Sequence, residues 1–171
     1  MKTAAKMTQG QGPPAGFDAK ADELIARYPV SKRSAALPLM HLWQETFGFI
    51  SGAGVEWIAA KLGIEPINIL ELVTFYPMFR QAPIGQHHIR ICRTLSCALA
   101  GARELHEELC RRTGASGDAH GPLTSPDGKY TIEFVECLAS CGTAPAAMIG
   151  DRLVERANSP EGIKDCLRET D

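Results

Sequence analysis

The sequence predicts an α/β protein in two parts, a helical first half followed by a smaller domain of mixed strands and helices. In the first half, apolar residues recur at three- and four-residue steps, which is the period of a helix. In the second half, short segments alternate between apolar and polar residues, which is the period of a strand. A loop with Pro83 and Gly85 separates the two patterns. We therefore expect a disordered tail over 1–16, a helical bundle over 17–82 and an α/β domain over 86–171.

Four helices are expected in the first half, each marked by residues that begin or end helices. Asp18 is the expected N-cap of the first helix. Pro38 starts or kinks the second helix, and Gly48 ends it. Gly63 closes the third, and Pro66 suits the first turn of the fourth. The bundle core is expected to contain both tryptophans, Trp43 and Trp57.

The second half is expected to follow the order β-α-β-β-β-α. The predicted elements are a strand at 88–92, a helix at 98–113, a strand at 130–135, a hairpin at 146–155 and a final helix that starts at Ser159 and Pro160. Glycines and prolines over 114–129 indicate a loop. This order suits a thioredoxin-like α/β domain, in which helices pack on a small mixed sheet.

Four cysteines occur in two close pairs, Cys92-x4-Cys97 and Cys137-x3-Cys141. Each pair lies where a predicted strand runs out into a loop, so each loop offers two sulfurs a few residues apart. Two such loops facing each other would form a four-sulfur cage. Cages of this kind hold either an iron–sulfur cluster or a zinc ion.

The spacing of the cysteines favours iron over zinc without excluding zinc. Structural zinc sites use two to four residues between paired cysteines, and the first pair lies at the edge of that range. A binuclear cluster is wider than one ion, so longer loops suit it better. Disulfides are the third alternative, although no export signal supports them. Two further cysteines stand alone on predicted helices and are expected to pack as small apolar side chains, Cys110 and Cys166.

Residues around the pairs suit a negatively charged, hydrogen-bonded cluster. Arg90 and Arg93 bracket Cys92 and are placed to offset part of the cluster charge. Ser96 and Ser140 are candidate hydroxyl donors to sulfur, beside their more ordinary role as solvated loop residues.

These motifs resemble the thioredoxin-like 2Fe-2S ferredoxin family, in the form that serves NADH-quinone oxidoreductase, respiratory complex I. The resemblance rests on the two cysteine motifs at 90–101 and 136–145. It extends into the helical half through 37–39, 44–45, 48–50 and 73–76. It implies a helical N-terminal extension and one 2Fe-2S cluster. The implied ligands are the four paired cysteines: Cys92, Cys97, Cys137 and Cys141.

The resemblance also implies a role and a set of partners. The chain is expected to be an electron-transfer subunit of an oxidoreductase, with no complete active site of its own. Its cluster would exchange one electron with the flavin of a partner subunit that binds NADH and FMN. The resemblance places it in the cytoplasm, peripheral to the inner membrane through its complex. The alternative parents are an NAD-linked formate dehydrogenase and a multimeric hydrogenase, whose small subunits share this module.

Two residues depart from the family pattern. Ala139 stands where these proteins often carry glycine, which matters if the position needs a positive φ. Leu153 replaces a commoner aromatic residue after the hairpin turn. Neither residue is an expected ligand.

Composition argues against nucleic-acid and membrane functions. The net charge is −2, so no broad positive surface is expected to attract nucleic acid or anionic lipid. No apolar run approaches the roughly 20 residues that cross a bilayer. The segment 56–73 reads like a helix-turn-helix, which makes a DNA-binding regulator the remote alternative. Lys61 is its only basic residue, so the phosphate contacts on which DNA affinity depends are nearly absent.

Overall fold

The computed structural model describes residues 13–117 and 121–168. Most of the expected tail at 1–16 lies outside the described residues. The chain divides between Pro83 and Ile84 into two compact units, a helical unit and an α/β unit.

Four α-helices and one 3₁₀ turn build the helical unit. They are α1 (Phe17–Ala26), η1 (Lys32–Ala35), α2 (Ala36–Phe47), α3 (Gly52–Leu62) and α4 (Pro66–Phe75). Gly48 and Gly63 end α2 and α3 in the left-handed conformation, as expected. Pro66 opens α4. The expected N-cap of α1 is wrong, because Gly16 occupies that position and Asp18 lies in the first turn.

Aromatic side chains meet in the core of the helical unit. Trp43 is buried, and its ring centroid lies 4.3 Å from that of Phe47 and 5.4 Å from that of Trp57. Phe17 packs edge-on against Trp43 at 5.7 Å, which fastens α1 to α2. The expectation for the two tryptophans is therefore confirmed, with Trp57 half-buried at the edge of the core.

Lys61 forms ion pairs within the helical unit. Its ammonium lies 3.0 Å from a carboxylate oxygen of Asp18 and 2.8 Å from one of Asp22. Hydrogen bonds to these carboxylates raise the pKa of Lys61. The single cation of the helix-turn-helix-like segment is thus neutralised by α1, which removes the charge that DNA phosphates would need.

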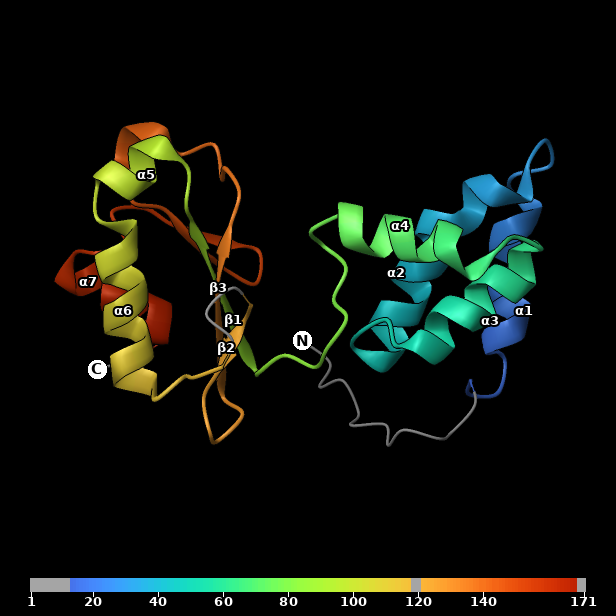
Figure 1. The fold of residues 1–171 in the computed structure, drawn as a ribbon, viewed down its shortest axis with the longest axis horizontal. Helices are drawn as coiled ribbons and strands as arrows, with labels where there is room; N and C mark the ends of the chain where they lie inside the picture. The colour runs from blue at the N-terminus through green and yellow to red at the C-terminus, as the bar shows by residue number, and fades with distance from the viewer. Residues whose placement is uncertain (1–12, 118–120, 169–171) are drawn as a thin grey trace. The chain divides into compact units, whose positions relative to one another are not determined.

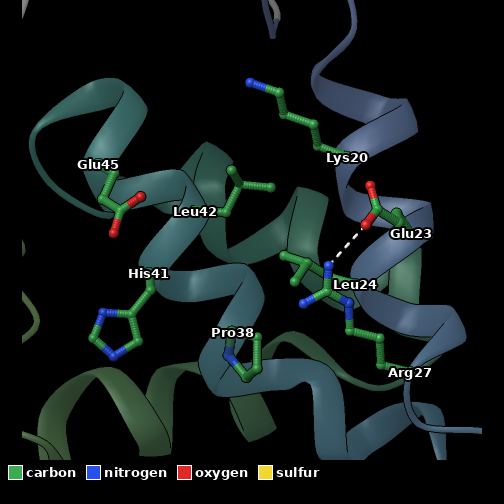
Figure 2. Close-up of a pocket in the computed structure, with 8 residues that line it drawn as sticks. All are labelled: Lys20, Glu23, Leu24, Arg27, Pro38, His41, Leu42 and Glu45. Carbon is green, nitrogen blue, oxygen red and sulfur yellow. Dashed lines mark hydrogen bonds and ion pairs between the residues drawn. The ribbon is translucent and has the colours of Figure 1, made fainter.

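A groove of about 450 Å³ lies between α1 and α2 (Figure 2). Apolar and charged side chains both line it, and Arg27 and Glu23 form an ion pair at 2.7 Å. Its lining residues are Lys20, Glu23, Leu24, Arg27, Pro38, His41, Leu42 and Glu45. None of these lining residues is a cysteine.

The α/β unit contains five strands and three α-helices among its described residues. They are β1 (His87–Cys92), α5 (Leu95–Leu99), α6 (Ala102–Thr113), β2 (Leu123–Thr124), β3 (Tyr130–Val135), β4 (Ala147–Ile149), β5 (Arg152–Val154) and α7 (Pro160–Leu167), with a 3₁₀ turn η2 (Cys141–Thr143) before β4. Two expectations need correction. The helix expected at 98–113 is broken, because Gly101 adopts a φ of 97° between α5 and α6. The loop expected at 114–129 contains β2, which pairs with β3.

The sheet has the order β2-β3-β1-β4-β5, and β1 pairs with β3 in parallel. The other neighbouring pairs are antiparallel. Helices α6 and α7 lie on the same side of this sheet (Figure 1). They cover a core that includes Ile89, Ile91 and Ile132. The expected mixed sheet with packed helices is confirmed.

No helix in the described part of the chain is both long enough and apolar enough to cross a bilayer.

Gly54 on α3 provides a test of the packing in the helical unit. A Cβ at this position would lie 2.6 Å from the Trp43 ring, whereas one at Gly52 would meet nothing within 4 Å. We expect Gly54→Ala to lower the free energy of unfolding of this unit by about 1–3 kcal/mol, because the buried indole must move. Denaturant unfolding followed by tryptophan fluorescence measures the effect. The control Gly52→Ala should be near neutral, and equal stability of the two variants would contradict this packing.

Candidate metal centre

The two cysteine motifs begin at adjacent points on one edge of the sheet. Cys92 is the last residue of β1 and lies opposite Val135, the last residue of β3. Because β1 and β3 are parallel, the chain leaves both strands in the same direction. The segments that follow are the first cysteine loop (92–101) and the second cysteine loop (136–145). Parallel pairing therefore brings together sulfurs that are about 45 residues apart in the sequence.

In the first cysteine loop, both thiols are buried. Cys92 and Cys97 are each 1% exposed, and their interaction lowers the pKa of Cys92 and raises that of Cys97. Cys97 reaches this position because α5 begins directly after Thr94. The Ala146 N–H donates to the Cys97 sulfur, while the Ala146 carbonyl accepts from the Cys92 N–H at 3.0 Å. The residue before β4 therefore holds both cysteines of this loop.

The pKa values of the two buried thiols are shifted in opposite directions. Burial raises the pKa of Cys97. Burial also acts to raise the pKa of Cys92, but hydrogen bonds from the Thr94 hydroxyl and from the Leu138 and Thr94 N–H groups outweigh it and lower this pKa. The Thr94 oxygen lies 3.2 Å from the Cys92 sulfur. Hydrogen bonds of this kind stabilise negative charge on sulfur, which is the form that binds metal.

The second cysteine loop is more open. Cys137 and Cys141 are exposed, and Cys141 begins the turn η2. The Ala139 N–H donates to the Cys137 sulfur over 3.3 Å. Ala139 adopts a φ of 58°, so the position that departs from the family pattern does require the left-handed conformation. The Leu138 N–H, next to Cys137, donates to Cys92 and so joins the second loop to the first.

The structure brings the predicted ligands together to different degrees. Cys92 and Cys97 are buried together, and Cys92 and Cys141 both lie near enough to Cys97 to act on its pKa. Within 13–117 and 121–168, no three His, Cys, Asp or Glu side chains are placed to hold one metal ion. All six cysteines are free thiols. The assignment of the four paired cysteines as ligands stays a prediction.

Cys110 and Cys166 lie apart from the two loops. Cys166 is fully buried on α7, and burial raises its pKa to about 12. Cys110 is half-buried on α6, where its sulfur lies 3.8 Å from a ring nitrogen of His106. Burial raises the pKa of Cys110 as well. Both thiols are therefore protonated at neutral pH, in line with the expected role as small apolar side chains.

The two arginines beside Cys92 already have partners. Arg93 donates to a carboxylate oxygen of Glu136 at 2.9 Å, which ties the start of the first loop to the start of the second. Arg90 donates to the carbonyl of Gly150 in the β4–β5 turn. Their proposed effect on cluster charge stays a prediction. Ser140 does not serve as a sulfur donor, because its hydroxyl donates to Glu155.

The donor set fits a 2Fe-2S cluster. Four thiols lie on two loops at one sheet edge, and such clusters are held by four thiolates. Backbone N–H groups are already directed at three of the sulfurs, in Cys92, Cys97 and Cys137. Sequence reasoning identified the cysteines from their spacing. It did not identify the backbone donors Leu138 and Ala146, because a main-chain N–H leaves no signal in a single sequence.

Comparisons with known proteins agree with this fit. Residues 21–171 match the family described as thioredoxin-like [2Fe-2S] ferredoxin. NADH-quinone oxidoreductase subunit 2 of Thermus thermophilus is 39% identical over 139 residues, which cover 79% of this chain and 75% of that protein. A second NADH-quinone oxidoreductase subunit, from Rhizobium meliloti, is 38% identical over 126 residues, which cover 74% of this chain and 72% of that protein.

A solved structure shares the fold. It is an NAD⁺-reducing [NiFe]-hydrogenase in the H₂-reduced state, which superposes with a TM-score of 0.56 at 18% identity. The match covers 93% of this chain and 22% of that hydrogenase chain. At this identity the likeness concerns the fold alone, and this chain corresponds to about a fifth of that larger one.

Replacing Ala139 by glycine tests the geometry of the second cysteine loop. An alanine in the left-handed conformation destabilises the folded state by about 1–2 kcal/mol. Glycine removes this strain, but it loses more conformational entropy on folding, so only part of the strain energy is recovered. We therefore expect Ala139→Gly to raise the free energy of unfolding of the metal-free chain by about 0.5–1 kcal/mol. The control is Ala100→Gly, since Ala100 has a φ of −88° and glycine should destabilise there. Thermal unfolding measures both, and destabilisation by Ala139→Gly would contradict the observed φ.

Proposed function

Because the chain belongs to the thioredoxin-like [2Fe-2S] ferredoxin family, we propose that it is an electron-transfer subunit that carries one 2Fe-2S cluster. The four paired cysteines are the proposed ligands: Cys92, Cys97, Cys137 and Cys141. The observation that carries this assignment is the parallel register of β1 and β3, which ends β1 at Cys92 opposite Val135 and so starts both cysteine loops at the same place. The cluster supplies one-electron redox chemistry. The chain supplies the thiolates, the N–H donors and a buried environment on one side.

The names of the relatives favour an NADH-oxidising parent complex. Two of them are subunits of NADH-quinone oxidoreductase and cover more than two thirds of this chain. We propose that the donor is a partner subunit that binds NADH and FMN, and that the complex sits on the cytoplasmic side of the inner membrane. A flavin delivers electrons singly to such a cluster, so this chain needs no substrate site of its own.

A soluble hydrogenase or a formate dehydrogenase is the second candidate parent. The observation that favours it is the shared fold with an NAD⁺-reducing [NiFe]-hydrogenase. Purification under mild conditions separates the candidates by what accompanies the chain. A quinone-reducing membrane assembly supports the first parent, and a soluble assembly that contains nickel or molybdenum supports the second.

Exposed leucines on α5 are the proposed contact with the flavoprotein. Leu95 and Leu99 are 75% and 81% exposed and lie one helical turn apart, on either side of the buried Cys97. Large apolar side chains this exposed, next to a redox centre, suit a partner surface. Docking there would bring the partner directly over the first cysteine loop.

Cysteine replacements test the ligand set. The wild-type chain, purified without oxygen, should contain two irons and two acid-labile sulfides and show a spin-half signal after reduction. Cys97→Ser and Cys141→Ser should each lose the cluster, because each removes one of four thiolates. The controls Cys110→Ser and Cys166→Ala should retain it. Stoichiometric zinc without sulfide would contradict the proposed cofactor, and a normal cluster in Cys141→Ser would contradict the ligand set.

Introducing a charge on α5 tests the proposed contact. We expect Leu95→Glu and Leu99→Glu each to weaken binding of the flavoprotein subunit about tenfold or more, because a charge must be desolvated at the interface. The iron and sulfide content should not change. Val30→Glu is the matched control, since Val30 is 99% exposed in the helical unit. Equal binding by all three variants, measured by co-purification or calorimetry, would contradict docking on α5.

A further inference from the structure

We infer that the segment between β5 and α7, residues 155–158, braces both cysteine loops, with Glu155 and Asn158 as positioning residues. This segment carries no cysteine and no recognised motif. It nevertheless contacts the second cysteine loop through Glu155 and the first through Asn158. The inference rests on the proposed cluster ligands and concerns how the chain holds them in place.

Glu155 holds the hydroxyl groups that flank Cys141. One of its carboxylate oxygens accepts hydrogen bonds from Thr143 at 2.7 Å and from Ser140 at 3.2 Å. The two hydroxyl oxygens also lie 2.7 Å from each other, so the three polar side chains contact one another. These bonds lower the pKa of Glu155, Thr143 most and Ser140 next. The carboxylate therefore fixes both ends of the turn that contains Cys141.

Backbone hydrogen bonds continue the brace along the exit of the second loop. The Arg156 N–H donates to the Thr143 carbonyl, and the Ala157 N–H donates to the Pro145 carbonyl, each at 2.8 Å. Ala157 is fully buried. Gly162 on α7 lets this backbone pack closely, because a Cβ there would lie 2.6 Å from the Arg156 carbonyl oxygen. Residues 156 and 157 are thus held between the second cysteine loop and α7.

Asn158 reaches the first cysteine loop. Its side-chain amide donates to the Ala100 carbonyl at 3.0 Å, at the end of α5. Ala100 is the C-cap of this helix, where carbonyl groups lack helical partners. The amide therefore satisfies an open carbonyl on the helix that carries Cys97. Together, Glu155 and Asn158 set the spacing between the α5 end of the first loop and the Cys141 turn of the second.

Outer contacts of this kind change how tightly a metal centre is held. Replacing residues that orient ligands typically costs about 10–100-fold in metal affinity. Loss of the Glu155 carboxylate should loosen the Cys141 turn, because Cys141 is exposed and both hydroxyls beside it bond to this carboxylate. The brace should therefore control how long the chain keeps its cluster, even though none of its residues touches iron.

The test measures the rate at which the holo-chain loses its visible absorbance to an iron chelator under anaerobic conditions. We expect Glu155→Gln, Thr143→Val and Asn158→Ala each to speed this loss about tenfold. Thr143→Ser keeps the hydroxyl and should behave like the wild type. The double variant Glu155→Gln/Thr143→Val should speed the loss by less than the product of the two single effects, because both changes act on the hydrogen bond between Thr143 and Glu155.

Two matched variants separate this effect from general changes in charge or stability. Glu107→Gln removes one negative charge from an exposed position on α6, outside both cysteine loops. Thr113→Val removes a hydroxyl that donates to the Leu109 carbonyl at 2.8 Å, the same side-chain loss in the same unit. Both should retain the wild-type rate. Thermal unfolding of each metal-free chain reports stability separately.

The outcomes distinguish the brace from the proposed function. A wild-type chain without iron and sulfide would contradict the cluster and the brace together. A wild-type chain with its cluster, whose Glu155→Gln and Thr143→Val variants release iron no faster than their controls, would contradict the brace alone. If Glu155→Gln fails to fold, the comparison of Thr143→Val with Thr143→Ser decides, and equal rates for these two would overturn the inference.

Discussion

The parallel pairing of β1 with β3 is the constraint on which the rest of the site depends. Parallel strands that end at the same edge send their following loops in the same direction, and here Cys92 lies opposite Val135. The hydrogen bond from the Leu138 N–H to the Cys92 sulfur then joins the loops directly. Without this register, two pairs of cysteines so far apart in the sequence would have no reason to face each other.

The surroundings of the cysteines divide the site into a buried half and an open half. Cys92 ends β1 and Cys97 lies on the buried side of α5, where backbone groups supply hydrogen bonds to sulfur. Cys137 and Cys141 face solvent. A centre built in this way is shielded on one side and accessible on the other. That arrangement suits a protein that must exchange electrons with a partner while keeping its ligands in place.

Much of the fold could be predicted from the sequence because its signals are local. Gly48, Gly63 and Pro66 end or begin helices through their own backbone preferences, and the structure agrees at all three. Errors arose where tertiary contacts decide. Strand β2 is two residues long and depends on pairing with β3 and on the bridge between Ser116 and Thr124. Helix α1 begins at Phe17 with Gly16 as its N-cap, and the Asp18 carboxylate in its first turn pairs with Lys61.

The cysteine ligands could be proposed from spacing, whereas their supports could not. Glu155 and Asn158 are common surface residues, and nothing in the sequence relates them to the distant loops that they contact. Backbone donors such as Ala146 are invisible for the same reason. Residues with reactive side chains, such as these cysteines, can be recognised from the sequence. The hydrogen bonds that orient them depend on contacts that form only in the folded chain.

X-ray absorption at the iron edge of the anaerobically purified chain tests the central claim most directly. The measurement reports the atoms bound to each iron and whether a second iron lies nearby. One 2Fe-2S cluster on the four paired cysteines predicts that only sulfur binds each iron and that each iron has one iron neighbour. Nitrogen or oxygen bound to iron, or a spectrum without an iron neighbour, would contradict it.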